Sequence, residues 1–440
     1  MTALYVCNIA AFFLIALLAP VALTRRFGLG ALNLLTIPVA CLLPVNALTT
    51  LSGPALFLED GCFNPYFQYA LLVSNVHDLL AALVTVVVVV RLVRHPALRR
   101  AGERLAAGAS AARPGRMRLA GAAFLALFLL SFVLLAQHSF SVAQWIASPR
   151  TGYQLHRTGA GQWFALCISC LSVSLVLATA YARSTHAILF LAPAYLLLCY
   201  LLGSKGIVIQ FSIYVVVIFV VRRYRHFGAV AALVLVGATA GTAATFIGGS
   251  ASGQVDFQSI ADYSDYYVNA AHYYQSYLGG SLPLFHGQVF LSSFWAVVPR
   301  FLYPDKPYVY GVINVVDVFY PGAAENTNTP AFATIDYFAD FGWLGVVTSG
   351  LLGLSTLFRA VLYAVVLPRL REFDPHAAPG GARSRLLAYA FLLLVAPDFL
   401  MLMDFPVNFI MCAFVVLVIE VANRLRYVGP PQAAPQGAPG

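Results

Sequence analysis

Apolar runs recur along almost the whole of this 440-residue chain, and each is about 17–25 residues long, the length of helix that crosses a bilayer. Hydrophobic residues make up 60% of the chain and charged residues only 10%, which excludes a soluble domain of this size. Because backbone groups in lipid must hydrogen-bond to one another, the runs predict α-helices and an all-α, polytopic membrane protein. We expect eleven spans, near residues 3–22, 31–49, 68–90, 119–137, 161–181, 186–202, 207–221, 228–247, 341–358, 386–402 and 407–422.

Arginine marks one side of the membrane. Alternate loops between the expected spans hold 20 of the 26 Lys and Arg residues, so the positive-inside rule places these loops in the cytoplasm, the N-terminus outside and the C-terminus inside. We interpret the eight arginines between residues 91 and 118 as contacts with anionic lipid heads, and the net charge of +9 as a topology signal that implies no nucleic-acid partner. The first run lacks a basic leader and a cleavage site, so we expect no cleaved signal peptide. Arg359 lies at the inner end of a span, and the cations on the outer side are Arg150, Arg157, Lys205, Arg300 and Lys306.

Polar residues concentrate in residues 249–340, which we call the polar segment and which hold eight of the seventeen carboxylates. A structureless loop of this length is unusual, so we expect helices that lie against the outer face of the membrane. Within it, residues 288–298 are apolar and fit a re-entrant or interfacial helix. The expected organisation is eight spans in residues 1–248, one large periplasmic loop in 249–340, three spans in 341–428 and a disordered tail in 429–440.

Two of the outer cations lie close together in the string Pro299-Arg300-Phe301-Leu302-Tyr303-Pro304-Asp305-Lys306-Pro307. Each proline restricts its own backbone and that of the residue before it, so the turn is stiff. Arg suits bidentate recognition of phosphate and Lys acts as a compact point charge, which predicts an anion site. The alternative is a pair of surface salt bridges between these cations and Asp305.

Carboxylates at the end of the polar segment are candidates for proton transfer. Asp336 and Asp340 are four residues apart on one face of an expected helix that runs from residue 331 into the span near 341–358. Two like charges near apolar surface raise the pKa of one of them, which suits a general base, and Glu325 is a further candidate. The alternative is a solvated acidic face.

Tyrosines and glycines supply further candidate binding residues. Tyrosine rings could stack on sugars, and the alternative is that they lie at the membrane interface, where the ring is buried and the hydroxyl is wet. The tyrosines in question are Tyr263, Tyr266, Tyr267, Tyr273, Tyr274 and Tyr277. The turn Gly203-Ser204-Lys205-Gly206 would let a phosphate approach the backbone beside Lys205, and Arg150 and Arg157 lie in another outer loop.

Polar and thiol groups inside the expected spans have two interpretations. His77 and Asp78 lie in the third span, where such groups are either functional or make polar contacts between helices. Cys167 and Cys170 share one helical face with no His or carboxylate nearby, so we interpret them as packing residues rather than as a redox pair or metal ligands.

These features resemble one known family. The string from Pro299 to Pro307, on the outer side of a many-span protein, resembles the Wzy-type O-antigen polymerases, which join oligosaccharide repeat units. Ten residues separate Arg300 from Gly311, which is similar to an Arg-x10-Gly pattern of that family, and the turn around Lys205 is similar to another of its motifs. A third motif of the family, which enters a helix, is similar to a run of this chain made up of Asn328-Thr329-Pro330, Asp336-Tyr337 and Phe341-Gly342-Trp343-Leu344-Gly345. A second Arg-x10-Gly pattern is matched only weakly, by Arg150 and Gly161.

The resemblance implies a GT-C-like glycosyltransferase of the bacterial inner membrane that works without a metal or other cofactor. Its substrates would be polyprenyl-diphosphate-linked oligosaccharides, and its partners membrane lipids, a chain-length regulator and a flippase. Arg300, Lys306 and Lys205 would neutralise the leaving diphosphate, with Asp305, Arg150 and Arg157 nearby. Asp336 would be the base, with Asp340 or Glu325 as alternates, and Tyr263, Tyr267 and Tyr274 would hold sugars. Two other functions stay open, an O-antigen ligase with a different acceptor and a polysaccharide flippase or transporter, although a transporter would concentrate polar groups at the midplane of its spans.

Overall fold

The computed structural model describes residues 2–29, 33, 35–111, 114–139, 141–155, 161–221, 266–298, 300, 302–325 and 330–372, together with 417 and 421. Throughout these residues the regular structure is helical, and no strand occurs in them. Among the described residues, five helical runs are long and apolar enough to cross a membrane, and two shorter apolar helices accompany them. The expected all-α, polytopic architecture is therefore confirmed.

Most of the expected spans coincide with helices. They are α1 (Thr2–Phe27), α2 (Thr36–Phe57), α3 (Pro65–Leu92), α5 (Pro114–Ser139), α8 (Gly161–Ala180), α9 (Thr185–Leu201) and α10 (Lys205–Val221). The expected spans near 228–247 and 386–402 lie outside the described residues, as does that near 407–422 apart from two residues.

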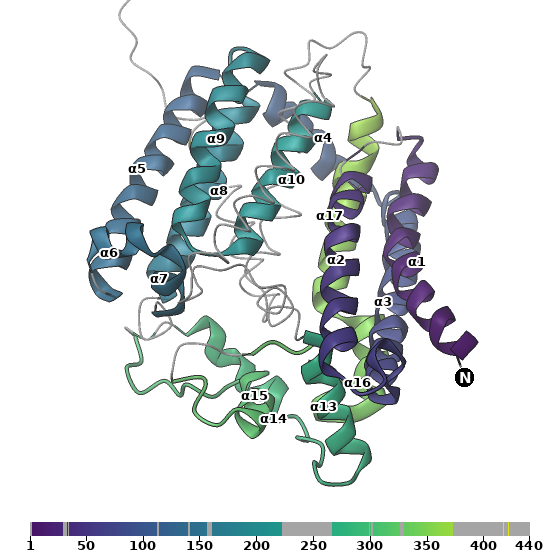
Figure 1. The fold of residues 1–440 in the computed structure, drawn as a ribbon. Coiled ribbons are helices and arrows are strands. Elements are labelled where there is room, and N and C mark those ends of the chain that lie inside the picture. Colours follow the sequence, from purple (N-terminus) through teal and green to yellow (C-terminus); the bar gives the residue numbers. More distant parts are fainter. Residues whose placement is uncertain are drawn as a thin grey trace, which may run out of the picture.

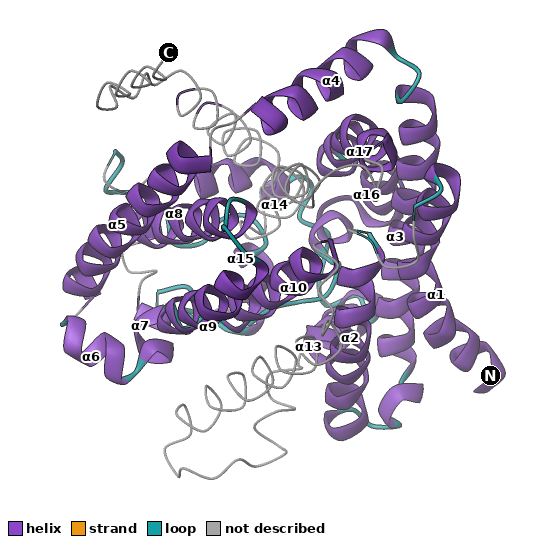
Figure 2. Ribbon diagram, turned by 90° about the horizontal axis from the view of Figure 1, so that it is seen from above, coloured by secondary structure: helices purple, strands orange, loops and turns teal. Residues whose placement is uncertain are grey.

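The helices form two groups that stand side by side (Figure 1). One group holds α5, α8, α9 and α10, in which α5 packs on α8 and α9 on α10. The other holds α1, α2, α3 and α17 (Leu354–Glu372), in which α1 and α17 both pack on α3. The view from above shows the same division (Figure 2).

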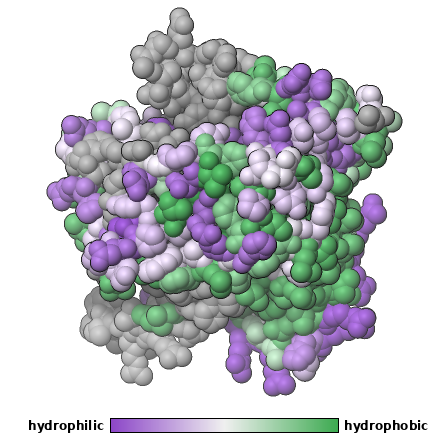
Figure 3. Space-filling view, turned by 90° about the horizontal axis from the view of Figure 1, so that it is seen from below, coloured by the Kyte–Doolittle hydropathy of each residue, from purple (hydrophilic) through white to green (hydrophobic). Residues whose placement is uncertain are grey.

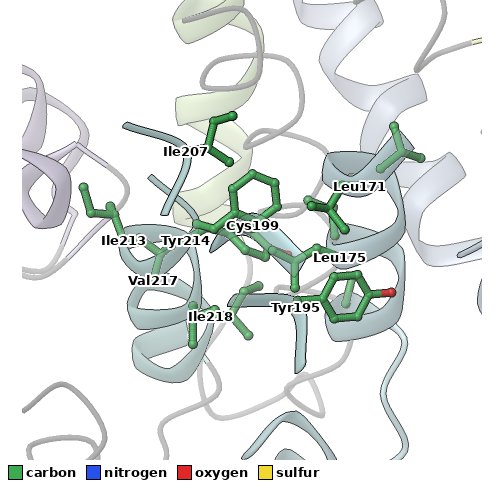
Figure 4. Close-up of a cluster of buried hydrophobic side chains, with 14 of the residues drawn as sticks. Leu171, Leu175, Tyr195, Cys199, Ile207, Ile213, Tyr214, Val217 and Ile218 are labelled. Carbon is green, nitrogen blue, oxygen red and sulfur yellow. The ribbon is translucent and has the colours of Figure 1, made fainter. Parts of the chain in front are cut away.

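A hydrophobic cluster fills the space between α8, α9 and α10. Tyr195, Cys199 and Tyr214 pack there with leucines of α8 (Figure 4). The two tyrosine hydroxyls are each within hydrogen-bond distance of a hydroxyl of α8, Tyr195 of Ser174 at 2.6 Å and Tyr214 of Thr179 at 2.8 Å. The polar groups in this apolar interior therefore form hydrogen bonds with one another, as polar groups out of reach of water in a membrane protein must.

The described part of the polar segment folds into short helices around a second hydrophobic cluster. They are α13 (Tyr266–Leu278), α14 (Gln288–Ser292), the 3₁₀ helix η4 (Ser293–Val297), α15 (Ile313–Phe319) and the first part of α16 (Asp336–Leu352). They gather at one end of the molecule, around the first half of α3 and the 3₁₀ helix η1 (Gly61–Phe63) (Figure 1). Seen from below, this end mixes hydrophilic and hydrophobic residues, whereas hydrophobic residues cover much of one flank (Figure 3).

Two short helices and one amphipathic helix complete the described chain. At the same end as the polar segment, α6 (Val142–Ala147) and α7 (Pro149–Leu155) follow α5. At the opposite end, α4 (Pro96–Ala111) extends from α3 and packs on α17 (Figure 1). Its arginines Arg99, Arg100 and Arg104 are exposed.

The expectation of one continuous helix from residue 331 through the span near 341–358 is wrong. Residues 330–335 are not helical, α16 is kinked at Gly342, and it ends before Gly353. At Gly342 the backbone has φ 59° and ψ −143°, which only glycine adopts readily. A Cβ at Gly345 would lie 2.1 Å from the carbonyl oxygen of Tyr337, so the two arms of α16 touch through their backbones. The apolar run continues beyond the expected span, to Arg369 in α17.

Candidate functional site

Residues 298, 300 and 302–311 belong to the loop between η4 and α15, which we call the cation loop. The guanidinium of Arg300 donates to the backbone carbonyl of Lys306 at 2.6 Å, and more distantly to those of Pro304 and Pro307. Its Cζ lies 4.0 Å from the centre of the Tyr308 ring, in cation–π geometry. Arg300 therefore braces the stiff turn that the two prolines predict.

Lys306 lies in the same loop, and its side chain is buried. The ammonium donates to the carbonyl of Val298 at 3.0 Å and lies 4.7 Å from the centre of the Tyr310 ring. Burial lowers the pKa of Lys306, and the positive charge of Arg300 lowers it further. The loop thus holds two cations close enough to repel each other.

Asp305 does not neutralise this pair. Its side chain is exposed, and among the described residues no ion pair joins it or any other carboxylate to Arg300 or Lys306. The alternative of surface salt bridges with Asp305 is therefore wrong. Two cations held together without a carboxylate create a strong local field for an anion.

The two ends of the cation loop are fastened by a polar network. Ser292 accepts hydrogen bonds from the backbone N–H of Gly311 at 2.9 Å and from the amide of Asn314 at 3.0 Å. Gly311 has φ +58°, and a Cβ there would lie 2.8 Å from the hydroxyl oxygen of Ser293. Glycine at this position, with ten residues between it and Arg300, is therefore what lets the loop close.

Asp340 holds the start of α14 against α16. Its carboxylate is buried and accepts three backbone hydrogen bonds, from Gly287 and Val289 at 3.0 Å each and from Phe290 at 2.6 Å. Such charge-assisted bonds are among the stronger ones in proteins. Since α14 and η4 lead directly into the cation loop, Asp340 positions that loop relative to α16.

Asp336 begins α16 and has a different environment from Asp340. It is half-buried, and the next residue, Tyr337, stacks its ring on His77 of α3 with centroids 5.8 Å apart and planes 16° apart. His77 is in turn bonded to Asp78, with 2.9 Å between Nδ1 and Oδ1. Glu325 is exposed at the end of the turn that follows α15.

The tyrosines expected to hold sugars are mostly part of the core. Tyr267 and Tyr274 are buried, Tyr267 against Phe12 and Phe67 and Tyr274 against Tyr69. Because neighbouring rings cover their faces, no sugar can stack on these two, and that expectation is corrected; Tyr263 lies outside the described residues. The exposed aromatic rings at this end include Tyr303, Tyr308, Tyr337 and Trp343.

The glycine turn before α10 packs against α7. Gly203 has φ +69°, and a Cβ there would lie 2.1 Å from the carbonyl oxygen of Pro149. The neighbouring Arg150 lies over the ring of Tyr153, 5.1 Å from its centre. The structure thus brings Arg150 to the turn that contains Lys205, on the helix group opposite α3 (Figure 1). The side chain of Lys205 and the whole of Arg157 lie outside the description.

Sequence reasoning missed two parts of this arrangement. It did not link Tyr337 to His77, because the two residues are more than 250 positions apart and only the fold joins them. It also missed Ser292 and Asn314, which close the cation loop. The signal for His77 was present, since a His-Asp pair is out of place in an apolar run.

Comparison with known proteins supports the resemblance that the motifs predict. The chain is 30% identical over 249 residues to two proteins named O-antigen polymerase, from Salmonella typhimurium and Salmonella typhi. The similarity to these two O-antigen polymerases extends over about half of the chain. The match covers 53% of this chain and 56% of each relative, so the chain spans about half the length of the curated relatives that it matches. No protein-family model matches the chain. No solved structure matches it either.

Proposed function

We propose that this protein polymerises polyprenyl-diphosphate-linked oligosaccharide repeat units into O-antigen or a similar surface polysaccharide, at the periplasmic face of the bacterial inner membrane. The observation that carries the proposal is the cation loop, in which Arg300 and Lys306 lie together without a carboxylate partner among the described residues. The name of the two Salmonella relatives supports the same activity.

A diphosphate suits the cation loop chemically. Arginine carries five N–H donors in a planar fork, and the contacts to backbone carbonyls use only Nη1 and Nη2 of Arg300. Lys306 adds a charge that is buried and therefore weakly screened by water. Fixed cations of this kind stabilise the charge that develops on a leaving diphosphate.

The transfer itself needs one base. The hydroxyl of one lipid-linked unit attacks the anomeric carbon of the other, and the bond from that carbon to the diphosphate oxygen breaks. The diphosphate leaves with the electron pair, and Asp336 takes the hydroxyl proton. We assign Asp340 to positioning, because both of its oxygens already accept backbone hydrogen bonds, and keep Glu325 as an alternate base. Tyr303, Tyr308, Tyr337 and Trp343 offer exposed rings for sugars.

No grouping of three His, Cys, Asp or Glu side chains suited to a metal occurs among the described residues, and the metal-independent mechanism stays a prediction. Arg150 and Lys205 are proposed as further contacts to lipid-linked phosphate, since Gly203, two residues before Lys205, packs against Pro149, the residue before Arg150.

The proposed orientation follows from charge. The exposed arginines of α4 lie at the opposite end of the bundle from the cation loop (Figure 1). By the positive-inside rule the α4 end faces the cytoplasm, so the cation loop and the N-terminus face the periplasm. A chain-length regulator and a flippase are the partners that such a polymerase would meet.

The test is a gel profile of surface polysaccharide from a strain lacking the gene, complemented with wild type, Arg300→Ala or Arg100→Ala. Arg100 is a matched control because it is an exposed arginine on α4. We expect wild type and Arg100→Ala to restore a long ladder, and Arg300→Ala to give lipid core with a single repeat unit. An unchanged ladder in the deletion strain would refute polymerisation, and loss of every repeat, including the first, would indicate a ligase or flippase.

A further inference from the structure

Exposed apolar side chains gather on the short helices that lead into the cation loop. On α14 and η4 the residues Phe290, Leu291 and Phe294 are 59%, 69% and 53% exposed, whereas Val289 and Ser293 are buried. This segment therefore has one buried side, which packs on the protein, and one apolar side that the protein does not cover.

The cation loop adds to this uncovered side. The ring of Trp295 in η4 contacts two other rings, with its centre 4.6 Å from that of Phe294 and 5.2 Å from that of Tyr303, and with interplanar angles of 34° and 32°. Tyr303 is exposed, and its neighbour Leu302 is 68% exposed. Trp295 thus joins the two parts into one surface, which we call the apolar patch and which consists of Phe290, Leu291, Phe294, Leu302 and Tyr303.

The apolar patch adjoins the exposed side of a helix that can cross the membrane. The helix α16 belongs to the candidate span Asp336–Arg369, and its Leu344 and Leu351, two helical turns apart, are both exposed. The helix α14 packs on α16. A Cβ at Gly287 would lie 3.4 Å from the ring of Phe341, which is itself exposed. The patch therefore continues a surface that a bilayer covers.

Cations stand beside the apolar patch. In the sequence, Arg300 and Lys306 lie on either side of the patch residues of the cation loop, and among the described residues no carboxylate forms an ion pair with either cation. Asp305 is the one carboxylate of the loop, and residues 287–299 hold no charged side chain. Apolar side chains edged by Arg and Lys suit the boundary of a phospholipid leaflet, where acyl chains meet phosphates.

We propose that the apolar patch inserts into the phospholipid leaflet at the end of the bundle where α14 lies (Figure 1), and holds Arg300 and Lys306 at the depth of the lipid phosphates. A leaflet removes these side chains from water, which an exposed patch in a soluble loop would not achieve. Asp340, which bonds the start of α14 to α16, fixes how deeply the patch enters. Insertion does not depend on the proposed function, but it would bring the two cations to the depth at which a lipid-linked diphosphate lies.

The test is photocrosslinking of the full-length protein in liposomes of phosphatidylethanolamine and phosphatidylglycerol that contain no lipid-linked oligosaccharide. The photoreactive amino acid p-benzoylphenylalanine replaces Leu291 or Phe294 in the patch or, as a matched control, Leu278. Leu278 is the last residue of α13 and is 51% exposed, close to the value for Phe294, and the three residues after it are Gly, Gly and Ser. Adducts are identified by mass spectrometry, and since no donor is present, the result does not depend on whether the protein polymerises anything.

We expect about 10-fold more phospholipid adduct at Leu291 and Phe294 than at Leu278, because only the patch lies among acyl chains. Equal yields at the three positions, or no phospholipid adduct, would overturn the proposal. Crosslinks between two copies of the chain would overturn it too, because they would assign the patch to a dimer interface. The same holds if added lipid-linked oligosaccharide replaces the phospholipid adduct by one with the polyprenyl chain.

A second measurement avoids the bulky photoreactive group. Leu291→Asp and Leu278→Asp are compared in phospholipid nanodiscs by hydrogen–deuterium exchange of residues 302–311, with peptides of α3 as the check that the fold is intact. A carboxylate at residue 291 opposes insertion, so exchange in the cation loop should become about 10-fold faster, the effect of losing the burial of one leucine. Leu278→Asp should exchange like wild type, and equal exchange in the two variants would contradict insertion.

Discussion

Asp340→Asn is the substitution whose effect the structure allows us to work out most directly. Oδ1 accepts hydrogen bonds from the N–H groups of Gly287 and Val289, and Oδ2 accepts one from Phe290. An asparagine can keep its oxygen toward the first two, but its NH₂ group then faces the N–H of Phe290. One charge-assisted bond is lost and two become neutral.

The expected cost follows from the strength of such bonds. A hydrogen bond to a charged group contributes about 1.5–3 kcal/mol, so losing one should reduce the free energy of opening the start of α14 by about 2 kcal/mol. This corresponds to roughly 30-fold faster hydrogen exchange at the amides of residues 287–290. Asp340→Ala removes all three bonds and on the same scale should cost about 4.5 kcal/mol or more.

The assay is hydrogen–deuterium exchange by mass spectrometry on the detergent-solubilised protein, read on peptides that cover residues 285–292. Asp317→Asn is the control on the same hydrophobic core, because Asp317 accepts a single backbone bond, from Gly322 at 3.0 Å, and an asparagine oxygen can accept it as well. Exchange in Asp340→Asn within threefold of wild type would refute the reasoning. So would equal changes in the two variants.

Three further predictions concern the same end of the molecule. Burial and the neighbouring guanidinium lower the pKa of Lys306, so Lys306 loses its charge at a lower pH than an exposed lysine does. The KM for the lipid-linked donor should therefore rise at alkaline pH. Lys306→Arg keeps the charge and should abolish this rise. A pH-independent wild-type KM would contradict this. Gly311→Ala should lower the free energy of unfolding by about 2–3 kcal/mol, and Gly280→Ala by about 1 kcal/mol. Both glycines have positive φ, but only at Gly311 would the added Cβ also meet a side chain. Equal losses of the two variants in chemical denaturation would count against this close contact. The hydroxyl of Tyr274 is buried and has no hydrogen-bond partner among the described residues, so Tyr274→Phe should change the unfolding free energy by less than about 0.5 kcal/mol or raise it. A clear loss in the same assay would mean that the hydroxyl has a partner.

Most of the helical architecture could be predicted from the sequence, because the hydrophobic effect acts on local runs. The helix from residue 161 to 180, for example, agrees with the expected span at 161–181. The expectation failed at residues 331–358, where Gly342 and Gly353 interrupt the helix. A glycine inside an apolar run does not reveal whether the backbone will use its freedom, since that depends on what approaches it.

The candidate site was predicted less completely. Arg300 and Lys306 were found because cations on the arginine-poor side of a membrane protein are conspicuous in the sequence. The sequence did not distinguish Asp336 from Asp340, which share a helical face but differ in partners: three backbone N–H groups occupy Asp340. Nor did it distinguish the buried rings of Tyr267 and Tyr274 from exposed ones.

By itself, the sequence determined the membrane class, the all-α fold and the segregation of polar residues into one segment, because hydrophobic length and charge distribution act without reference to distant residues. Only the tertiary structure decided which polar groups are already used and which are available. In the tertiary structure the ring of Tyr337 stacks on His77, and Asp340 accepts hydrogen bonds from the start of α14. Among the described residues, no carboxylate forms an ion pair with Arg300 or Lys306 of the cation loop. Burial and hydrogen-bond partners depend on residues far apart in the chain, and chemistry depends on burial and partners.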